Sequence, residues 1–260
     1  MSLYDPLYSF RSKLEGRAEL LCVDRLGHWW SDIGGSEYIL PDAHADAIAR
    51  LMKLRGIPGA IIVGHSFRGA ITEELAVRHP DMVSGLVFLS PVLYCWKGEV
   101  AWSYDAASKP VTGSLFSALL APTVGLFAIG CATRDVFAPN PKPADHISRT
   151  NATQAVRPSA FRRNAPEISA LNDWGNEAFA GYGKIRAPTV IITGDADKIV
   201  SPDAHARHLA RDIGGARLIV VHNLGHNPTS LPMILLQPQS SASRDRKSIS
   251  TQLPETSSDG

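Results

Sequence analysis

The sequence predicts an α/β fold, a mostly parallel sheet flanked by helices, with a helical cap inserted into the chain. Short apolar runs alternate with amphipathic segments, which is the pattern of a parallel sheet covered by helices on both faces. A long stretch without a strand separates two groups of these units and indicates an insertion. With 260 residues, 44% of them hydrophobic and 20% charged, the chain suits one large core plus a subdomain.

The first group of elements has clear boundaries. We expect a buried strand over 18–23, a helix over 42–55, a strand over 60–63, a helix over 67–78 and a strand over 85–89. The helix over 42–55 carries its apolar residues at helical spacing. Asp42 can cap its start and Gly56 can end it.

The second group returns to the same alternation near the end of the chain. We expect strands over 189–193 and 217–221, separated by a helix over 203–211. The gap before them is too long for a plain crossover, so we assign residues 93–185 to a helical cap. The predicted core comprises residues 1–92 and 186–228.

One uncharged stretch within the cap, residues 110–133, is long enough to span a bilayer. Pro122, Gly125 and Gly130 interrupt it, so we favour helices that cover a pocket over a membrane-contacting surface. Residues 137–143 contain three prolines and predict an extended connector.

The two ends of the chain differ from the rest. The first residues contain no apolar run typical of a signal peptide, so we expect a cytoplasmic location. Residues 229–260 are rich in serine and have no helical period, which indicates a disordered tail.

Charge and cysteine content exclude several functional classes. The 26 basic and 25 acidic residues leave almost no net charge, and no basic stripe indicates nucleic-acid binding. Cys22, Cys95 and Cys131 match neither a disulfide framework nor a zinc motif, so we interpret them as buried free thiols. His205 and His208 lie three apart on a predicted helix, a spacing that fits a solvated helix face better than a metal site.

Ser66 has the setting of a catalytic nucleophile. It follows the strand that ends at Val63 and precedes a helix, and such a strand–turn–helix bend strains the serine backbone and projects its hydroxyl outward. The close approach of strand and helix requires very small residues two places before and two places after the serine. Gly64 meets this requirement, whereas Arg68 does not, and Gly69 follows one place late.

An acid and a histidine follow later strands in the order that a triad requires. Asp197 comes after the strand over 189–193, and His226 comes after the strand over 217–221. His226 can take the serine proton at neutral pH, and a carboxylate on its other nitrogen fixes the tautomer. We favour Asp197 for this role over Asp195, and either aspartate could instead cap a turn.

Five segments give the chain its resemblance to the α/β-hydrolase superfamily, in particular to an esterase-like branch with a cap domain. They are VDRLGHWWSD (23–32), IIVGHSFRGA (61–70), GLVFLSP (85–91), APTVIITGDADKIVSP (187–202) and NLGHNP (223–228). The resemblance implies hydrolysis of an ester-like bond in a small molecule through an acyl-Ser66 intermediate, without a cofactor. It also implies that the backbone N–H of Phe67 contributes to the oxyanion hole.

The sequence departs from the family pattern at several points. The family begins with further strands and a His-Gly loop that donates a second oxyanion N–H, and it ends with a helix that residues 229–260 do not resemble. Arg68 and Trp29 stand where the family has glycine, and Trp29 would be strained if that position has a positive φ. These departures keep an alternative open, a catalytically impaired remnant or a non-enzymatic binding member of the same fold.

Overall fold

The core of the structure is a four-stranded parallel sheet. The computed structural model describes residues 14, 16–32, 34–35, 37–96, 109 and 112–227. The strands are β1 (Ala60–His65), β2 (Val83–Leu89), β3 (Thr189–Gly194) and β4 (Arg217–Val221). They lie in the order β1-β2-β3-β4, and each neighbouring pair is parallel. Their carboxyl ends therefore meet at one edge, where functional groups of parallel sheets gather.

Helices connect these strands, and several of them lie between β2 and β3, where the sequence predicts an insertion. They are α2 (Pro41–Leu54), α3 (Phe67–Arg78), α5 (Thr112–Phe137), α6 (His146–Arg149), α7 (Pro158–Tyr182) and α8 (Ala206–Asp212), with short 3-10 turns at Pro80–Met82 and Ala152–Val156. At the start of α2 the Asp42 carboxylate accepts the N–H of Ala43, although Asp42 lies inside the helix rather than at its cap. Gly56 follows its end with a φ of 66°, a conformation that glycine adopts without strain.

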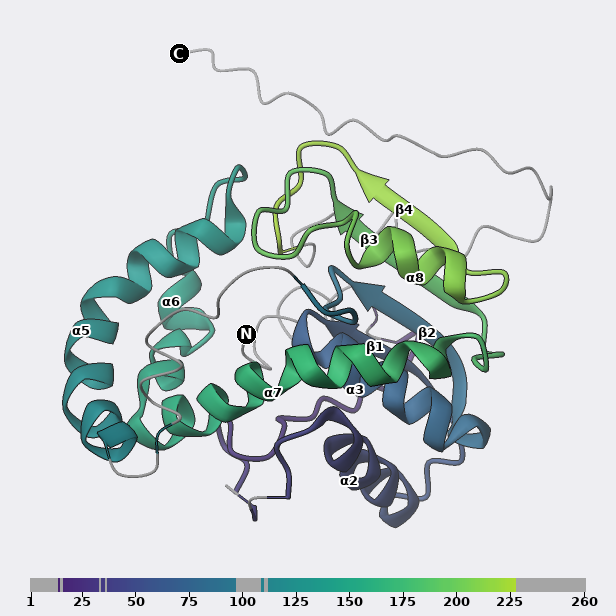
Figure 1. Cartoon of the computed structure of the whole chain (residues 1–260), viewed down its shortest axis with the longest axis horizontal. Helices are drawn as coiled ribbons and strands as arrows, with labels where there is room; N and C mark the ends of the chain where they lie inside the picture. The colour runs from purple at the N-terminus through teal and green to yellow at the C-terminus, as the bar shows by residue number, and fades with distance from the viewer. Residues whose placement is uncertain are drawn as a thin grey trace.

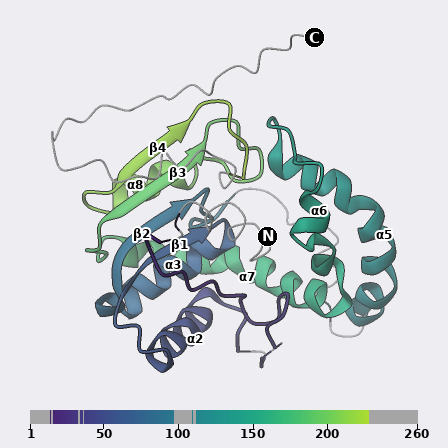
Figure 2. The same ribbon diagram turned by 180° about the vertical axis from the view of Figure 1, so that it is seen from behind.

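The two faces of the sheet are covered differently. The main apolar core joins residues of α2, α3, α7 and α8 to one face. The cluster on the other face consists of strand residues and Leu224, and there Ile61 and Val63 of β1 are 66% and 53% exposed. Figure 2 shows this side of the sheet without a helix in front of it. The predicted parallel sheet flanked by helices is therefore confirmed, although in the part of the chain that the structure describes these helices pack against one face rather than both.

Most of the expected elements are present at or near their expected boundaries. The exception is the strand expected over 18–23, which forms no ladder in the structure. Leu20 and Leu21 are 40% and 43% exposed there. An apolar run becomes a buried strand only beside a partner, and β1, at the edge of the described sheet, pairs with β2 alone.

The insertion contains two long helices that prolines do not interrupt. Helix α5 continues through Pro122, and α7 continues through Pro166. A proline removes one backbone hydrogen bond from a helix, and the remaining turns of these helices are held by their own hydrogen bonds. The expectation that Pro122 breaks the uncharged stretch is therefore wrong. None of the helices that the structure describes has the length and hydropathy needed to cross a membrane.

The long helix α7 joins the insertion to the core. In Figure 1 it runs from the α5 and α6 region across the face of the sheet. Its first half lies toward α5, whereas Leu171, Trp174 and Tyr182 in its second half pack in the main core. The division into a core and a cap over 93–185 stays a prediction, and α7 belongs structurally to both parts.

The expectation for the cysteines is confirmed in part, and the expectation for the C-terminal tail is not tested. The thiols are free, as expected, but Cys95 and Cys131 are exposed rather than buried, and Cys22 is half-buried. The predicted tail over 229–260 lies outside the described residues.

Candidate active site

Ser66 occupies a sharp bend between β1 and α3. Its φ of 55° and ψ of −125° lie outside the regions that a serine ordinarily adopts, and its carbonyl accepts the N–H of Gly69. A Cβ atom on Gly64 would lie 2.5 Å from the Arg68 carbonyl oxygen and 2.3 Å from the Thr72 hydroxyl. The bend therefore requires glycine at position 64, and it has the geometry that the sequence predicted.

Arg68 is accommodated without loss of this bend. A Cβ atom on Gly69 would lie 2.7 Å from Cβ of Pro91, so Gly69 is the position after the serine that cannot carry a side chain. Arg68, by contrast, has room for its half-buried side chain. The requirement for a very small residue thus falls one place later than the sequence pattern suggested.

His226 and Asp197 form a buried pair beyond the ends of β3 and β4. The distance from His226 Nδ1 to Asp197 Oδ2 is 2.8 Å. The other carboxylate oxygen accepts the backbone N–H groups of Ile199 and Val200, each at 2.9 Å. These three hydrogen bonds use both carboxylate oxygens and Nδ1 of the ring, and Nε2 makes no hydrogen bond to any of the residues that the structure describes.

Asp195 lies in the same loop but contacts a different histidine. Its Oδ2 is 2.8 Å from Nδ1 of His222, and its Oδ1 accepts the N–H of Asn223 at 2.7 Å. Asn223 has a φ of 54°, so Asp195 caps a left-handed turn. This geometry favours Asp197 as the partner of His226 and gives Asp195 the turn-capping role.

His65 binds the backbone of the loop that carries His226. Its Nε2 donates to the carbonyl oxygen of His226 at 2.8 Å, and the two rings lie 4.8 Å apart. Burial, and next the neighbouring His226, lower the pKa of His65 well below its ordinary value. A neutral His65 can therefore hold the backbone of the loop, as expected for a residue that is not itself the base.

Ser66 is connected to the loop of His226 through its neighbour His65. Ser66 follows His65 directly, and His65 binds the backbone of His226. Among the described residues, the Ser66 hydroxyl makes no hydrogen bond to His226. Such contacts are often long before substrate binds and close in the reacting complex.

The loop after Asp24 brings a charged group over Phe67. The guanidinium carbon of Arg25 lies 4.2 Å from the centre of the Phe67 ring. Trp29 is buried with a φ of 48°, so the strain expected for this residue in place of glycine is present. The contact between Arg25 and Phe67 could not be predicted from the sequence, because no short motif links residues so far apart.

The connector after α5 holds the loop that carries His226. The Asn140 side chain donates to the carbonyl of Asn223 at 2.8 Å and accepts the N–H of Gly225 at 2.9 Å. A Cβ atom on Gly225 would lie 2.1 Å from the Ala138 carbonyl oxygen, so this approach requires glycine. Asn140 therefore fixes the backbone on both sides of Leu224.

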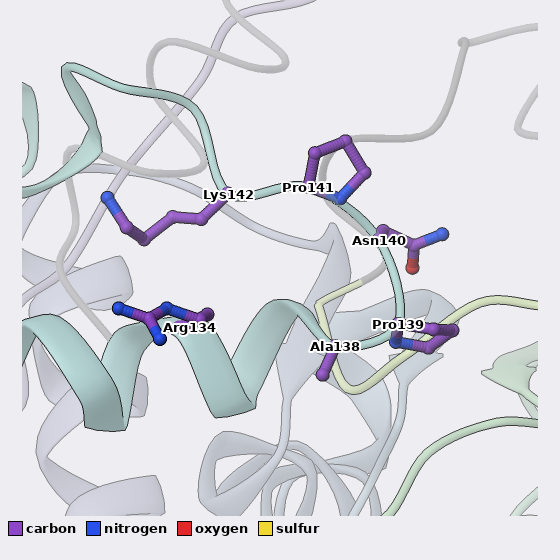
Figure 3. A pocket seen from close by; sticks show the side chains of 6 residues that line it. All are labelled: Arg134, Ala138, Pro139, Asn140, Pro141 and Lys142. Atoms are coloured by element: carbon purple, nitrogen blue, oxygen red, sulfur yellow. The ribbon is translucent and has the colours of Figure 1, made fainter. Parts of the chain in front are cut away.

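A surface pocket of about 420 Å³ lies along the same connector. Its lining residues are Arg134, Ala138, Pro139, Asn140, Pro141 and Lys142. Figure 3 shows the Arg134 and Lys142 side chains extending to one side of the connector, away from the Asn140 amide. The pocket is therefore adjacent to the histidine loop but is not formed by it.

His205 is not on a solvated helix face. Its side chain is buried, and its Nδ1 accepts the backbone N–H groups of Leu93 and Tyr94 at 3.2 and 3.1 Å. Burial lowers its pKa to about 4, so it is neutral and free to accept. The expectation was wrong for His205 because this residue precedes α8, whereas His208 within α8 is exposed as expected. Within the described residues, no group of histidine, cysteine and acidic side chains could hold a metal ion.

The chain is similar to several known proteins. The chain is 31% identical over 179 residues to the pimeloyl-[acyl-carrier protein] methyl ester esterase of Aromatoleum aromaticum, a match that covers 65% of this chain and 67% of the relative. It also resembles the esterase EaEST of Exiguobacterium antarcticum, with a TM-score of 0.69, 18% identity and coverage of 86% and 81%. The enol-lactonase of Burkholderia xenovorans LB400 matches with a TM-score of 0.65, 20% identity and coverage of 86% and 80%. The family model described as the alpha/beta hydrolase fold matches residues 5–229, and the chain therefore belongs to the alpha/beta hydrolase fold family.

Proposed function

We propose that the protein is a serine hydrolase that cleaves an ester-like bond in a small molecule. The observation that carries the proposal is the buried pair of His226 and Asp197 at the sheet edge that also bears the strained Ser66. The relatives named above, an esterase and a methyl ester esterase among them, support the same class of reaction.

The reaction would proceed in two steps. Ser66 Oγ attacks the substrate carbonyl while Nε2 of His226 takes its proton, and Asp197 stabilises the resulting imidazolium. The backbone N–H of Phe67, at the start of α3, has no partner within its own helix and can bind the oxyanion. His226 then protonates the leaving alcohol, and a water molecule activated by His226 releases the acid from Ser66.

A serine-directed probe and a chromogenic ester test the proposal together. We expect a fluorophosphonate to label the wild-type chain and the wild type to hydrolyse p-nitrophenyl acetate. The Ser66→Ala variant should do neither, whereas Ser148→Ala, a change at an exposed serine of α6, should leave both unchanged. A folded wild type that is neither labelled nor active would overturn the proposal.

One observation favours the second candidate, a catalytically impaired or binding member of the fold. The Ser66 hydroxyl is not hydrogen-bonded to His226 in the part of the chain that the structure describes. The impaired form predicts slow labelling of Ser66 without steady turnover, and full turnover by the purified chain would exclude it.

A further inference from the structure

Glu167 of α7 is a buried carboxylate surrounded by four basic side chains. Its side chain is fully buried, and its Oε2 lies 2.9 Å from both Arg25 Nη1 and His28 Nε2. Its Oε1 lies 3.1 Å from Arg163 Nε and 3.5 Å from His44 Nε2. These partners come from the loop after residue 24, from α2 and from α7 itself, so one carboxylate ties three elements together.

The charge of Glu167 is maintained by this surrounding. Burial alone would raise its pKa, but Arg25, followed by His28 and His44, lowers it below the ordinary value. Burial, and next the charge of Arg25, lower the pKa of His28 to about 3, so that this ring is neutral and donates as a neutral group. The ionised carboxylate therefore faces two permanent cations, Arg25 and Arg163, and the removal of its charge would leave both without this buried counterion.

The network reaches the start of α3 through Arg25. The second terminal nitrogen of Arg25 donates to Asn164 at 2.7 Å, so two residues of α7 hold the guanidinium. The guanidinium carbon lies 4.2 Å from the centre of the Phe67 ring, and the His44 ring meets Phe67 edge-on at 6.5 Å. The Phe67 ring thus contacts two side chains that also lie close to Glu167.

We propose that Glu167 is a positioning residue that holds Arg25 against the Phe67 ring and thereby fixes the backbone N–H of Phe67 beside Ser66. The proposal rests on the proposed function, because that N–H is the donor assigned to the oxyanion. Glu167 itself takes no part in the chemistry. Its effect is to limit rotation of the first residue of α3, where a small displacement weakens transition-state stabilisation.

The Glu167→Gln variant tests the proposal, because it keeps the size of the side chain and removes its charge. The matched control is Glu177→Gln, an exposed glutamate of the same helix. We expect kcat for p-nitrophenyl acetate, counted per site titrated with a fluorophosphonate, to fall on the order of tenfold while KM changes less than about twofold. Counting per titrated site removes the effect of any unfolded fraction. An unchanged kcat per site would overturn the proposal.

A second variant covers the case in which Glu167→Gln does not fold. Arg25→Lys keeps the positive charge but loses the planar group that lies over Phe67. We expect it to lower kcat per site by a similar factor, and a wild-type value would contradict the proposed route through Arg25.

Hydrogen exchange separates this proposal from the proposed function. If the wild type hydrolyses no ester, the enzymatic role fails but the positioning role can still be measured. We then expect amides in the peptide spanning residues 64–70 to exchange faster in Glu167→Gln than in Glu177→Gln. Equal exchange in the two variants would show that Glu167 does not fix this segment.

Discussion

Two aspartate–histidine pairs join the same two loops, and their hydrogen bonds have the same length. Asp197 with His226 and Asp195 with His222 each join Oδ2 to Nδ1 at 2.8 Å. The side chains of the first pair are 0% and 5% exposed, whereas those of the second are 38% and 64% exposed. A hydrogen bond between aspartate and histidine therefore does not identify a catalytic pair by itself. The burial of the two side chains distinguishes the pairs.

The surroundings decide what each pair can contribute. Around Asp197 water is excluded, and two backbone N–H groups fix the carboxylate, so its charge acts on His226 with little screening. Around Asp195 solvent screens the interaction, and exposed pairs of this kind contribute about 0–1 kcal/mol to stability. We therefore expect chemistry to depend on the buried pair and local turn geometry to depend on the exposed pair.

Replacement of the histidines should give the largest contrast. His226→Ala removes the base and should lower kcat by at least about 10³-fold, since no other described side chain is placed to take the serine proton. His222→Ala should change kcat less than about threefold. Steady-state hydrolysis of p-nitrophenyl acetate measures both, and comparable losses in the two variants would remove the distinction between the pairs.

Replacement of the aspartates should repeat the contrast at a smaller scale. Asp197→Asn keeps the shape but presents an amide to His226, which should lower kcat by about 10²–10⁴ through the wrong tautomer. Asp195→Asn should lower it less than about threefold. If kcat per titrated site fell more in Asp195→Asn, the assignment of the triad acid would have to be reversed.

Replacement of Asn140 tests whether the loop that joins His222 to His226 must be held in place. Its side chain binds the carbonyl of Asn223 and the N–H of Gly225, and so fixes the loop between His222 and His226. Asn140→Ala should lower kcat roughly fivefold to tenfold, because the loop is misplaced while the base is retained. Asn176→Ala, at an exposed position of α7, is the control. Equal activity of the two variants would show that the hydrogen bonds of Asn140 are not needed to position His226.

Glu73 is also a buried acid, but unlike Asp197 it has surroundings that oppose its negative charge. Burial, and next Glu74, raise its pKa to about 9, and its Oε2 has no hydrogen-bond partner among the described residues. Because the folded pKa exceeds the unfolded value near 4.5, stability is lost as the pH rises from about 4.5 through 9. Glu73→Gln should therefore raise the Tm at pH 8 by at least about 3 °C and change it little at pH 4.5. Thermal melts at both pH values measure this, and a lower Tm at pH 8 would contradict it.

Much of the fold could be predicted because it depends on local patterns. The strands over 60–63, 85–89, 189–193 and 217–221 are short apolar runs that the sheet buries, and α2 and α3 have clear ends. The run over 18–23 has the same appearance but lacks a neighbouring strand, which no local pattern reveals. The continuity of α5 through Pro122 was missed for a similar reason, because packing can override a local helix breaker.

The candidate site also contains residues that the sequence predicted and residues that it did not. The strand ends led to the prediction of Ser66, Asp197 and His226 as the catalytic residues, and the structure joins the last two by a hydrogen bond. The contact between Arg25 and Glu167 could not be predicted, since 142 positions separate them and neither lies in a motif that names the other. Asn140 was not predicted, because it lies in the connector over 137–143, whose prolines indicate an extended segment but no functional role.

The roles of Ser66 as the nucleophile and of Asp197 as the triad acid are tested most directly by mass spectrometry of the chain after rapid quenching of a reaction with p-nitrophenyl acetate. We expect an acetyl group on the peptide that contains Ser66, formed much more slowly in Asp197→Asn and at the wild-type rate in Asp195→Asn. An acetyl group found only at other residues of the folded wild type, or equal slowing in the two aspartate variants, would contradict these roles.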